Sequence, residues 1–257
     1  MSRKLITLIM LISLVVTLAM SGCGQQSNQS AAKTIKVGSE TTFPPFEFQD
    51  DQTKDYVGFD VDLVKAIGKQ LGCEIEFVSM GFDGLIPALE SKQIDVAASG
   101  MTITPERSEK VTFSQPYYKS GLSVITKKTD TTINSFNDLA GKRLAVQIGT
   151  TSAETAKKIP TATVREFNSP SEAFLELSAG GADAVINDLP VNEYYLSQGG
   201  NKDFKLVGEV INAEDYGLAI NKNNPELAEK INTALTELKK NGEYDKIYEK
   251  WFGKKPQ

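Results

Sequence analysis

The segment PYYKSGLSVITKK (Pro116–Lys128) separates two series of alternating strand and helix patterns. Before it, short β-rich runs such as TIKVGS, CEIEFVS and IDVAASG alternate with helical apolar spacing, as in DVDLVKAIGKQLG (Asp60–Gly72) and FDGLIPALESKQ. After it come RLAVQIG, TSAETAKKI, TVREF, SPSEAFLELSAGG and ADAVIND. Two such series predict two parallel-sheet α/β lobes.

A second extended segment, INAEDYGLAINK (Ile211–Lys222), follows the second series. The last helical patterns, NPELAEKINTALTELKKNG and EYDKIYEKWFG, must then pack on the first lobe, because the second is already complete. The chain therefore crosses between the lobes twice, which predicts a hinge with a cleft beside it. The predicted first lobe comprises 34–119 plus 217–257, and the second 120–216 with the hinge strands at its ends.

Composition excludes some functions. The chain has 257 residues, of which 40% are hydrophobic and 24% charged, as expected for one or two globular domains. Its net charge is −5 and it has no block rich in lysine and arginine, so a nucleic-acid partner is not expected.

The N-terminus is typical of a secretory signal. Arg3 and Lys4 precede LITLIMLISLVVTLAM, an apolar run shorter than the roughly 20 residues of a membrane span, and SGC follows. The MSGC ending resembles a lipobox, which predicts a signal peptide over 1–22 and a lipidated Cys23; the alternative is a plain signal peptide with an incidental cysteine. The polar stretch that completes 23–33 is interpreted as a tether to a membrane anchor. Cys73, the only other cysteine, is expected to be a buried small apolar residue.

The stretch SGMTITPERSE (Ser99–Glu109) contains an unusual arginine. Thr104 and Pro105 indicate a helix start, with a hydroxyl N-cap and a proline at the first helical position. Arg107 lies three residues after the cap, where a capping box has Glu or Gln and where the helix dipole disfavours a cation.

Two other helix starts in the chain, TSAE (Thr151–Glu154) and SPSE (Ser169–Glu172), have the usual acid at that position. Ligands of open α/β sheets gather outside the carboxyl ends of the strands, and Arg107 lies just beyond the strand IDVAASG. We therefore expect its guanidinium to grip a ligand's carboxylate with two parallel hydrogen bonds. The alternative is a surface arginine that pairs with Glu106 or Glu109.

Several collinear motifs between Ile35 and Gly253 carry a family resemblance: TTFPPFEF, VGFDVDL, GFDGLIPAL, GMTITPERSEKVTFSQPYY, AVQIGTT, NDLP and NGEYDKIYEKWFG. They resemble the solute-binding proteins of bacterial polar amino acid ABC importers, family 3, and most closely the glutamine- and arginine-binding members. The resemblance implies the type II periplasmic-binding-protein fold, with two α/β lobes joined by a two-strand hinge. It also implies a cleft that closes on a free L-amino acid and delivers it to a membrane permease.

The resemblance assigns the amino acid clamp to particular residues. Arg107 matches the arginine that holds the ligand's α-carboxylate, helped by the main-chain N–H groups of Thr102 and Thr151. Asp188 matches the aspartate that pairs with the α-ammonium, together with the Gly100 carbonyl and the Thr102 hydroxyl. From the residues alone, Asp188 would serve equally well as the N-cap of the helix LPVNEYY.

Aromatic residues complete the site that the resemblance implies. Phe43 and Phe82 match rings that sandwich the ligand side chain, where a ring also attracts a cation. Taken singly, each would more often be a core residue. Phe46, Phe48 and Phe59 are assigned to the core.

Three positions depart from the glutamine-binding pattern: Glu40, Gln147 and Asn187 stand where it has aspartate, lysine and histidine. With Arg107 and Asp188 neutralised by the ligand's α-groups, Glu40 is left as the unbalanced charge near the ligand side chain. A lone buried carboxylate is costly, so a basic ligand, arginine or lysine, is favoured modestly over glutamine. Glu40 would say nothing about specificity if it were an exposed acid at a strand end.

Other functional classes make different demands on the sequence. A dehydratase-like enzyme on this fold would need a general acid in the cleft, and without any histidine the main candidate is Glu40. A sensor domain would be expected to have a transmembrane or signalling segment downstream, and an adhesive surface lipoprotein would not explain Arg107. We expect no catalytic residues, metal or cofactor, a monomer, and an extracytoplasmic protein anchored by lipid to the cell membrane, in a periplasm or on a Gram-positive surface.

Overall fold

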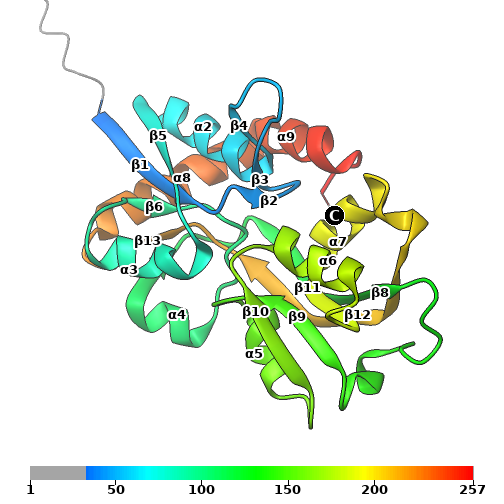
Figure 1. Ribbon diagram of the computed structural model, residues 1–257. Coiled ribbons are helices and arrows are strands. Elements are labelled where there is room, and N and C mark those ends of the chain that lie inside the picture. Colours follow the sequence, from blue (N-terminus) through cyan, green and yellow to red (C-terminus); the bar gives the residue numbers. More distant parts are fainter. Residues whose placement is uncertain (1–32, 257) are drawn as a thin grey trace, which may run out of the picture. The chain divides into compact units, whose positions relative to one another are not determined.

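The computed structural model describes residues 33–256 (Figure 1). The predicted signal peptide and Cys23 lie outside these residues. Within the described part of the chain, no helix is both long and apolar enough to cross a membrane.

Strands far apart in the sequence form the first five-stranded sheet, in the order β5-β1-β6-β13-β7. Strand β1 runs parallel to β5 and β6, whereas β13 runs antiparallel to both β6 and β7. Their bounds are β5 (Cys73–Ser79), β1 (Lys33–Ser39), β6 (Val96–Ala97), β13 (Ala219–Asn221) and β7 (Val111–Phe113). A small antiparallel sheet next in sequence to β1 consists of β2 (Thr42–Phe43), β3 (Glu47–Gln49) and β4 (Tyr56–Val57).

The second five-stranded sheet has the order β10-β9-β11-β8-β12. Strand β9 runs parallel to β10 and β11, and β8 runs antiparallel to β11 and β12. The bounds are β10 (Thr163–Phe167), β9 (Arg143–Gln147), β11 (Ala184–Asp188), β8 (Tyr118–Lys127) and β12 (Phe204–Tyr216).

Helices cover both sheets (Figure 1). Those of the first series and of the C-terminal part are α2 (Phe59–Leu71), η1 (Phe82–Gly84), α3 (Leu85–Glu90), α4 (Pro105–Lys110), α8 (Pro225–Lys240) and α9 (Glu243–Phe252). Those of the second series are η2 (Phe136–Leu139), α5 (Thr151–Lys157), α6 (Pro170–Ala179), α7 (Leu189–Ser197) and η3 (Gly200–Lys202).

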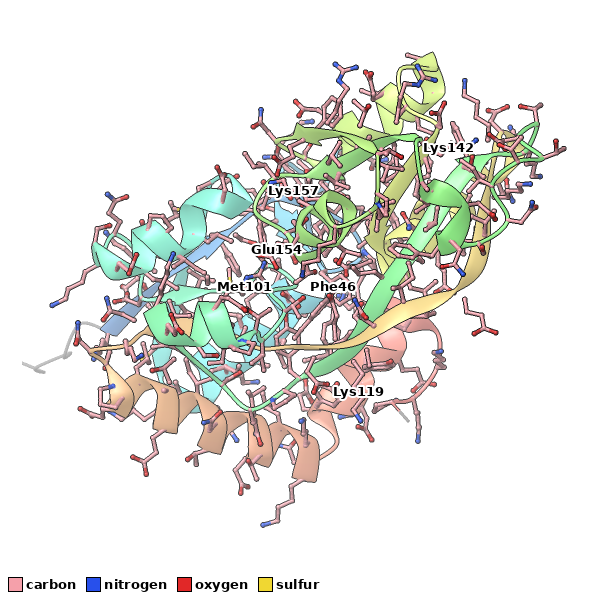
Figure 2. All side chains as sticks on the ribbon, turned by 90° about the horizontal axis from the view of Figure 1, so that it is seen from below. Phe46, Met101, Lys119, Lys142, Glu154 and Lys157 are labelled. Atoms are coloured by element: carbon pink, nitrogen blue, oxygen red, sulfur yellow. The ribbon has the colours of Figure 1, made fainter. Side chains whose placement is uncertain are left out.

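Strands β8 and β12 are the two segments expected to cross between the lobes. They pair antiparallel from Tyr118↔Tyr216 to Lys127↔Phe204, and Figure 2 shows them running together past Lys119. Three residues after β12, the chain enters β13 of the first sheet. The βαβ strands run parallel as predicted. The returning strands β8 and β12 run antiparallel to each other, because a chain that leaves and re-enters along neighbouring paths must run in opposite directions.

The core of the first sheet is shared with the C-terminal helices. Leu63 of α2, Leu235 of α8 and Ile247 of α9 belong to one buried cluster with Val37 of β1. Figure 1 shows the orange α8 and red α9 beside α2. Cys73 packs at the edge of this cluster and is only half-buried, so the expectation of a buried thiol is corrected: it stands at the first residue of the edge strand β5.

The second sheet has a core on each face. Leu144 and Val146 of β9 belong to the cluster that α5 covers, whereas Ala145 between them belongs to the cluster of α6, which includes Phe174. Alternate side chains of a strand point to opposite faces, so this division is the one expected for a sheet covered on both sides.

Helix starts agree with the sequence in all but one place. Ser169 caps α6 and accepts a hydrogen bond from the N–H of Glu172. Helix α5 is capped by Thr150 rather than by Thr151, because the Thr150 hydroxyl accepts from the N–H of Ala153. Thr151 is therefore the first helical residue, and the predicted capping box there is wrong by one position.

Candidate functional site

Nine of the ten predicted ligand contacts line one cavity. The first sheet and its helices contribute Glu40, Phe43, Phe82, Gly100, Thr102 and Arg107, and the second sheet with α5 contributes Gln147, Thr151 and Asp188. Ser99 and Thr150 also line it and were not predicted.

The parallel strands explain why these residues meet. Glu40 follows β1 directly, Ser99 follows β6 by one residue, and Gln147 and Asp188 are the last residues of β9 and β11. The carboxyl ends of the parallel strands of both sheets therefore face one space, the position where ligands bind in open α/β sheets.

Arg107 is the cation of the cavity, and it is buried, with 8% of its surface exposed. Its Nη1 donates to the carbonyl of Thr102 at 2.8 Å and its Nη2 to the carbonyl of Gly149 at 3.0 Å. Its guanidinium carbon lies 5.3 Å from the centre of the Phe82 ring. Helix α4 begins as expected, with the Thr104 hydroxyl accepting from the N–H of Arg107 at 3.2 Å.

No carboxylate among residues 33–256 comes within ion-pair distance of Arg107, so the predicted alternative of a surface pair with Glu106 or Glu109 does not occur. Burial lowers the pKa of its guanidinium, and the more distant carboxylates of Glu154 and Glu214 oppose that. A buried guanidinium held only by two carbonyls keeps donors and charge available for an anion.

Asp188 is a carboxyl in the cavity wall that acts on the charge of Arg107, and it is also 8% exposed. It occupies the N-cap position of α7, but its side chain makes no capping bond, and its Oδ1 has no hydrogen-bond partner among the described residues. Burial raises the pKa of Asp188 well above its usual range, and the neighbouring Glu214 raises it further. Helix capping therefore does not explain this residue, and a cationic partner would.

Glu40 lies in the wall of the cavity and is 6% exposed, so it is not an exposed acid at a strand end. The Thr42 hydroxyl donates to its Oε1 at 2.6 Å, while its Oε2 has no partner among the described residues. Burial raises the pKa of Glu40, and hydrogen bonds from Thr42 and Gln147 oppose that. Gln147 also donates from Nε2 to the carbonyl of Asn168 at 3.1 Å.

The main-chain N–H of Thr102 is free to face the cavity. Thr102 forms a single antiparallel bridge with Tyr216, and its bonds run between the flanking residues: from the N–H of Ile103 to the carbonyl of Asp215, and from the N–H of Gly217 to the carbonyl of Met101. In such a pair the N–H and C=O of Thr102 itself point away from the partner strand. Figure 2 places Met101 near the centre of the molecule, close in view to Glu154 of α5.

Buried carboxyls support the wall from behind. The N–H of Gly100 donates to Oδ2 of Asp60 at 3.0 Å, and the Tyr117 hydroxyl donates to the same atom at 2.6 Å. The Ser99 hydroxyl donates to Oε1 of Glu47 at 2.8 Å. Burial raises the pKa of Asp60 to about 6, and burial with the nearby Asp60 raises the pKa of Glu47 well above its usual range.

Gly100 needs to be glycine at this position. Its φ is 50°, in the left-handed region, and a Cβ would come within 2.7 Å of the Phe43 ring. The ring of Phe43 is buried in the cavity wall, whereas Phe82 is half-buried with its face toward Arg107.

Asn187 is the one predicted contact that the structure does not bring to the cavity wall. It precedes Asp188 on β11, so its side chain points to the other face of that strand, and its main-chain oxygen accepts from Ser123 and Asn192. Its side chain is buried.

Sequence reasoning missed Ser99, Thr150 and Glu214. The first two are immediate neighbours of predicted contacts. Glu214 carried a signal of its own, because it is two residues from Tyr216 on an extended segment and therefore shares the inward face with a residue expected to be buried. It is 7% exposed, and its Oε2 accepts from the Thr102 hydroxyl at 2.9 Å.

No group of three or more side chains that could hold a metal ion occurs within residues 33–256. The polar groups at the cavity are instead one guanidinium, carboxyls, hydroxyls and main-chain groups, a set suited to a small zwitterion.

Comparisons with known proteins agree with this description. The sequence profile of the bacterial extracellular solute-binding proteins, family 3, matches residues 35–254. The arginine-binding extracellular protein ArtP of Bacillus subtilis (strain 168) is 38% identical over 255 residues, covering 95% of this chain and 97% of that protein.

Solved structures give the same result for the fold. An ancestral arginine-binding protein is 51% identical, with a TM-score of 0.83 over 86% of this chain and 98% of that one, and it has been solved with arginine and with glutamine bound. The predicted two-lobed α/β fold and the family resemblance are confirmed.

Proposed function

Because the chain belongs to the bacterial extracellular solute-binding proteins, family 3, we propose that it binds a free polar L-amino acid for an ABC importer and delivers it to the permease. One observation carries the proposal: a buried guanidinium without a carboxylate partner and a buried carboxyl with an unpartnered oxygen line the same cavity within residues 33–256. An α-amino acid supplies both missing charges.

The α-carboxylate binds Arg107, whose Nη1 and Nη2 are already oriented by the carbonyls of Thr102 and Gly149. The main-chain N–H of Thr102 and the N–H of Thr151 at the start of α5 add donors to the same group. The α-ammonium binds Asp188 and the carbonyl of Gly100. This assignment needs no covalent chemistry, and the relatives compared above are described as binding proteins, which supports binding over the dehydratase alternative.

The ligand side chain extends toward Glu40, between Phe43 and Phe82. The unpartnered Oε2 of Glu40 favours a ligand that brings a cation, since a buried carboxylate without one is costly. We therefore propose arginine as the preferred ligand, followed by lysine, with glutamine able to donate its amide N–H to the same oxygen. An ancestral relative solved with arginine and with glutamine supports both as candidates, and the order given to them rests on the charge of Glu40.

The lobes, 34–119 plus 217–257 and 120–216, close on the ligand by bending where β8 and β12 leave the second sheet. The Nη2 bond from Arg107 to Gly149 already links residues of the two lobes, which supports a hinge closed around the cavity. A lipidated Cys23 and the tether after it hold the protein at the outer face of the cell membrane, where it acts as a monomer.

Calorimetric titration of the signal-free protein with the common amino acids tests the function. We expect arginine to bind most tightly, lysine and glutamine more weakly, and aspartate and glutamate not at all, because they add a carboxylate beside Glu40. Purification through full denaturation and refolding beforehand removes any ligand retained from the cells. If none of the amino acids gives a binding heat or raises the melting temperature, the proposed function is wrong.

A further inference from the structure

The clamp described above makes no use of Glu214, although this side chain is buried beside it. Glu214 lies on β12, with 7% of its surface exposed, and it contacts the cavity through the Thr102 hydroxyl, which donates to its Oε2 at 2.9 Å. Asp188, at the end of β11, lines the cavity and keeps one buried oxygen without a partner among the described residues. Two buried carboxyls are thus found on the side of the cavity where the ligand's ammonium is expected: Asp188 lines the cavity with Thr102, and Glu214 is bonded to the Thr102 hydroxyl.

The charges that face this pair do not balance it. Arg107 from α4 is a cation that acts on Asp188, and Tyr216 from β12 contributes a neutral hydroxyl. The carboxylate of Glu154 from α5 also interacts with Arg107, so the same positive charge has to compensate a third acid. The Tyr216 hydroxyl already donates to the Ser120 hydroxyl at 3.1 Å. Two buried carboxylates that share one cation with a third acid carry an excess of negative charge, which is costly in a cavity of low polarity.

We propose that Asp188 and Glu214 hold one proton between them while the cleft is empty, and that the ligand's ammonium displaces this proton to solvent. This inference rests on the proposed amino acid binding and adds the proton balance of the same site. Burial raises the pKa of Asp188 well above its usual range, with the Glu214 carboxyl as the next cause, and this agrees with a retained proton.

At the position of the ammonium the exchange conserves charge, and the ligand's carboxylate is placed against Arg107. An ammonium that enters with its single positive charge replaces the proton, so both carboxylates become ionised and the ligand gains two anionic neighbours, one of them through Thr102. Thr102 then acts as a relay whose hydroxyl orientation is fixed by Glu214. Because the free protein carries one proton more than the complex, affinity must rise with pH, by up to tenfold per pH unit, over the range where the pair still holds the proton.

The experiment is calorimetric titration with arginine at pH 5.5, 6.5, 7.5 and 8.5, each in two buffers of different ionisation enthalpy. The dependence of the binding heat on the buffer gives the number of protons released. The variant Glu214→Gln keeps an oxygen that accepts from Thr102 and removes the second carboxyl. The matched control is Asp215→Asn, which removes the adjacent, exposed carboxylate of the same strand.

In the wild type and in Asp215→Asn we expect close to one proton released at the acid end, declining at higher pH, with a parallel gain in affinity. In Glu214→Gln we expect binding that releases few protons and an affinity that changes less than threefold over the same range. A merely structural Glu214 would lower affinity and leave the proton count unchanged, which would overturn the proposal.

Glu40 is a second source of protons, and titration with two different ligands distinguishes it from the Asp188 and Glu214 pair. The ammonium is common to arginine and glutamine, so a proton from the Asp188 and Glu214 pair is released by both, whereas a proton from Glu40 is released only by arginine. Release with arginine alone, or none with either ligand, contradicts the inference while leaving amino acid binding intact. Absence of any binding heat would instead contradict the proposed function.

Discussion

Replacement of Arg107 by alanine is the sharpest test of the clamp. The side chain is buried, donates from Nη1 and Nη2 to the carbonyls of Thr102 and Gly149, and has no carboxylate within ion-pair distance in residues 33–256. Arg107→Ala leaves the ligand's carboxylate in a closed cavity without its cation. Hydrogen bonds to charged groups contribute about 1.5–3 kcal/mol each, so losing a two-bond contact should cost at least about 3 kcal/mol, or more than about a hundredfold in Kd.

Arg107→Ala should also have two effects on the free energy of unfolding, which are smaller and oppose each other. Two carbonyls lose a donor, which costs about 1 kcal/mol each, while a buried cation and a residue unfavourable at its helix position are removed. We expect the free energy of unfolding without ligand to change by less than about 2 kcal/mol. Loss of binding with a folded protein is therefore the expected outcome.

Calorimetric titration with arginine measures the first effect, and urea unfolding without ligand measures the second. Arg165→Ala is the matched control, because Arg165 is an exposed arginine of β10 that pairs with Glu176 at the surface. Arg107→Lys separates charge from geometry: it should recover part of the affinity, since an ammonium cannot make the two parallel bonds. An Arg107→Ala variant that binds arginine within threefold of wild type would refute the clamp.

Three further predictions follow from other groups. Glu40→Gln should weaken arginine binding by about 2 kcal/mol and glutamine binding less, measured by titration, and equal losses would mean that Glu40 does not contact the side chain. Burial raises the pKa of Asp60 from 3.8 to about 6, so the stability that this carboxyl contributes below pH 4 is lost as pH rises through about 6. Asp60→Asn should remove that loss, which amounts to about 3 kcal/mol in the free energy of unfolding by urea between pH 4 and 7. If variant and wild type differ in this free energy by the same amount at every pH in the range, the prediction is wrong. Cys23→Ser should move the full-length protein out of the membrane fraction or leave it unprocessed, and unmodified wild type found wholly in the soluble fraction would argue against an anchor.

Much of the fold could be predicted because strand and helix patterns are local. The spacing that indicates a helix at Asp60–Gly72 is realised as α2, which Gly72 ends in the left-handed conformation. Arg107 could be found because it breaks a local rule, and residues that do so without compensation within their own helix often serve a ligand. The clamp positions also depended on the family resemblance, since Asp188 alone fits a helix cap equally well.

What could not be predicted depends on contacts between distant segments. The direction in which β8 and β12 pair is decided by how the chain returns, and nothing within either segment specifies it. The family resemblance assigns Asn187 to the site by its position along the chain. The side chain of its neighbour Asp188 faces the cavity, however, and the side chains of adjacent strand residues point to opposite faces. The proposed pairing of Glu214 with Asp188 joins residues of two strands that are not neighbours in the sheet order, so no pattern within either strand predicts it.

The charges of the site favour a basic ligand by an amount that can be estimated. Glu40 has one oxygen bonded to Thr42 and the other without a partner among the described residues, so the neutral amide of glutamine and the guanidinium of arginine compete for the same acceptor. A charge-assisted bond is about twice as strong as a neutral one, a gain of about 1–2 kcal/mol, or roughly tenfold in Kd. Burial also raises the pKa of Glu40, which reduces this gain at low pH and leaves it intact where the carboxyl is ionised. Selectivity for arginine over glutamine should therefore increase as pH rises, whereas the proton shared by Asp188 and Glu214 affects both ligands alike.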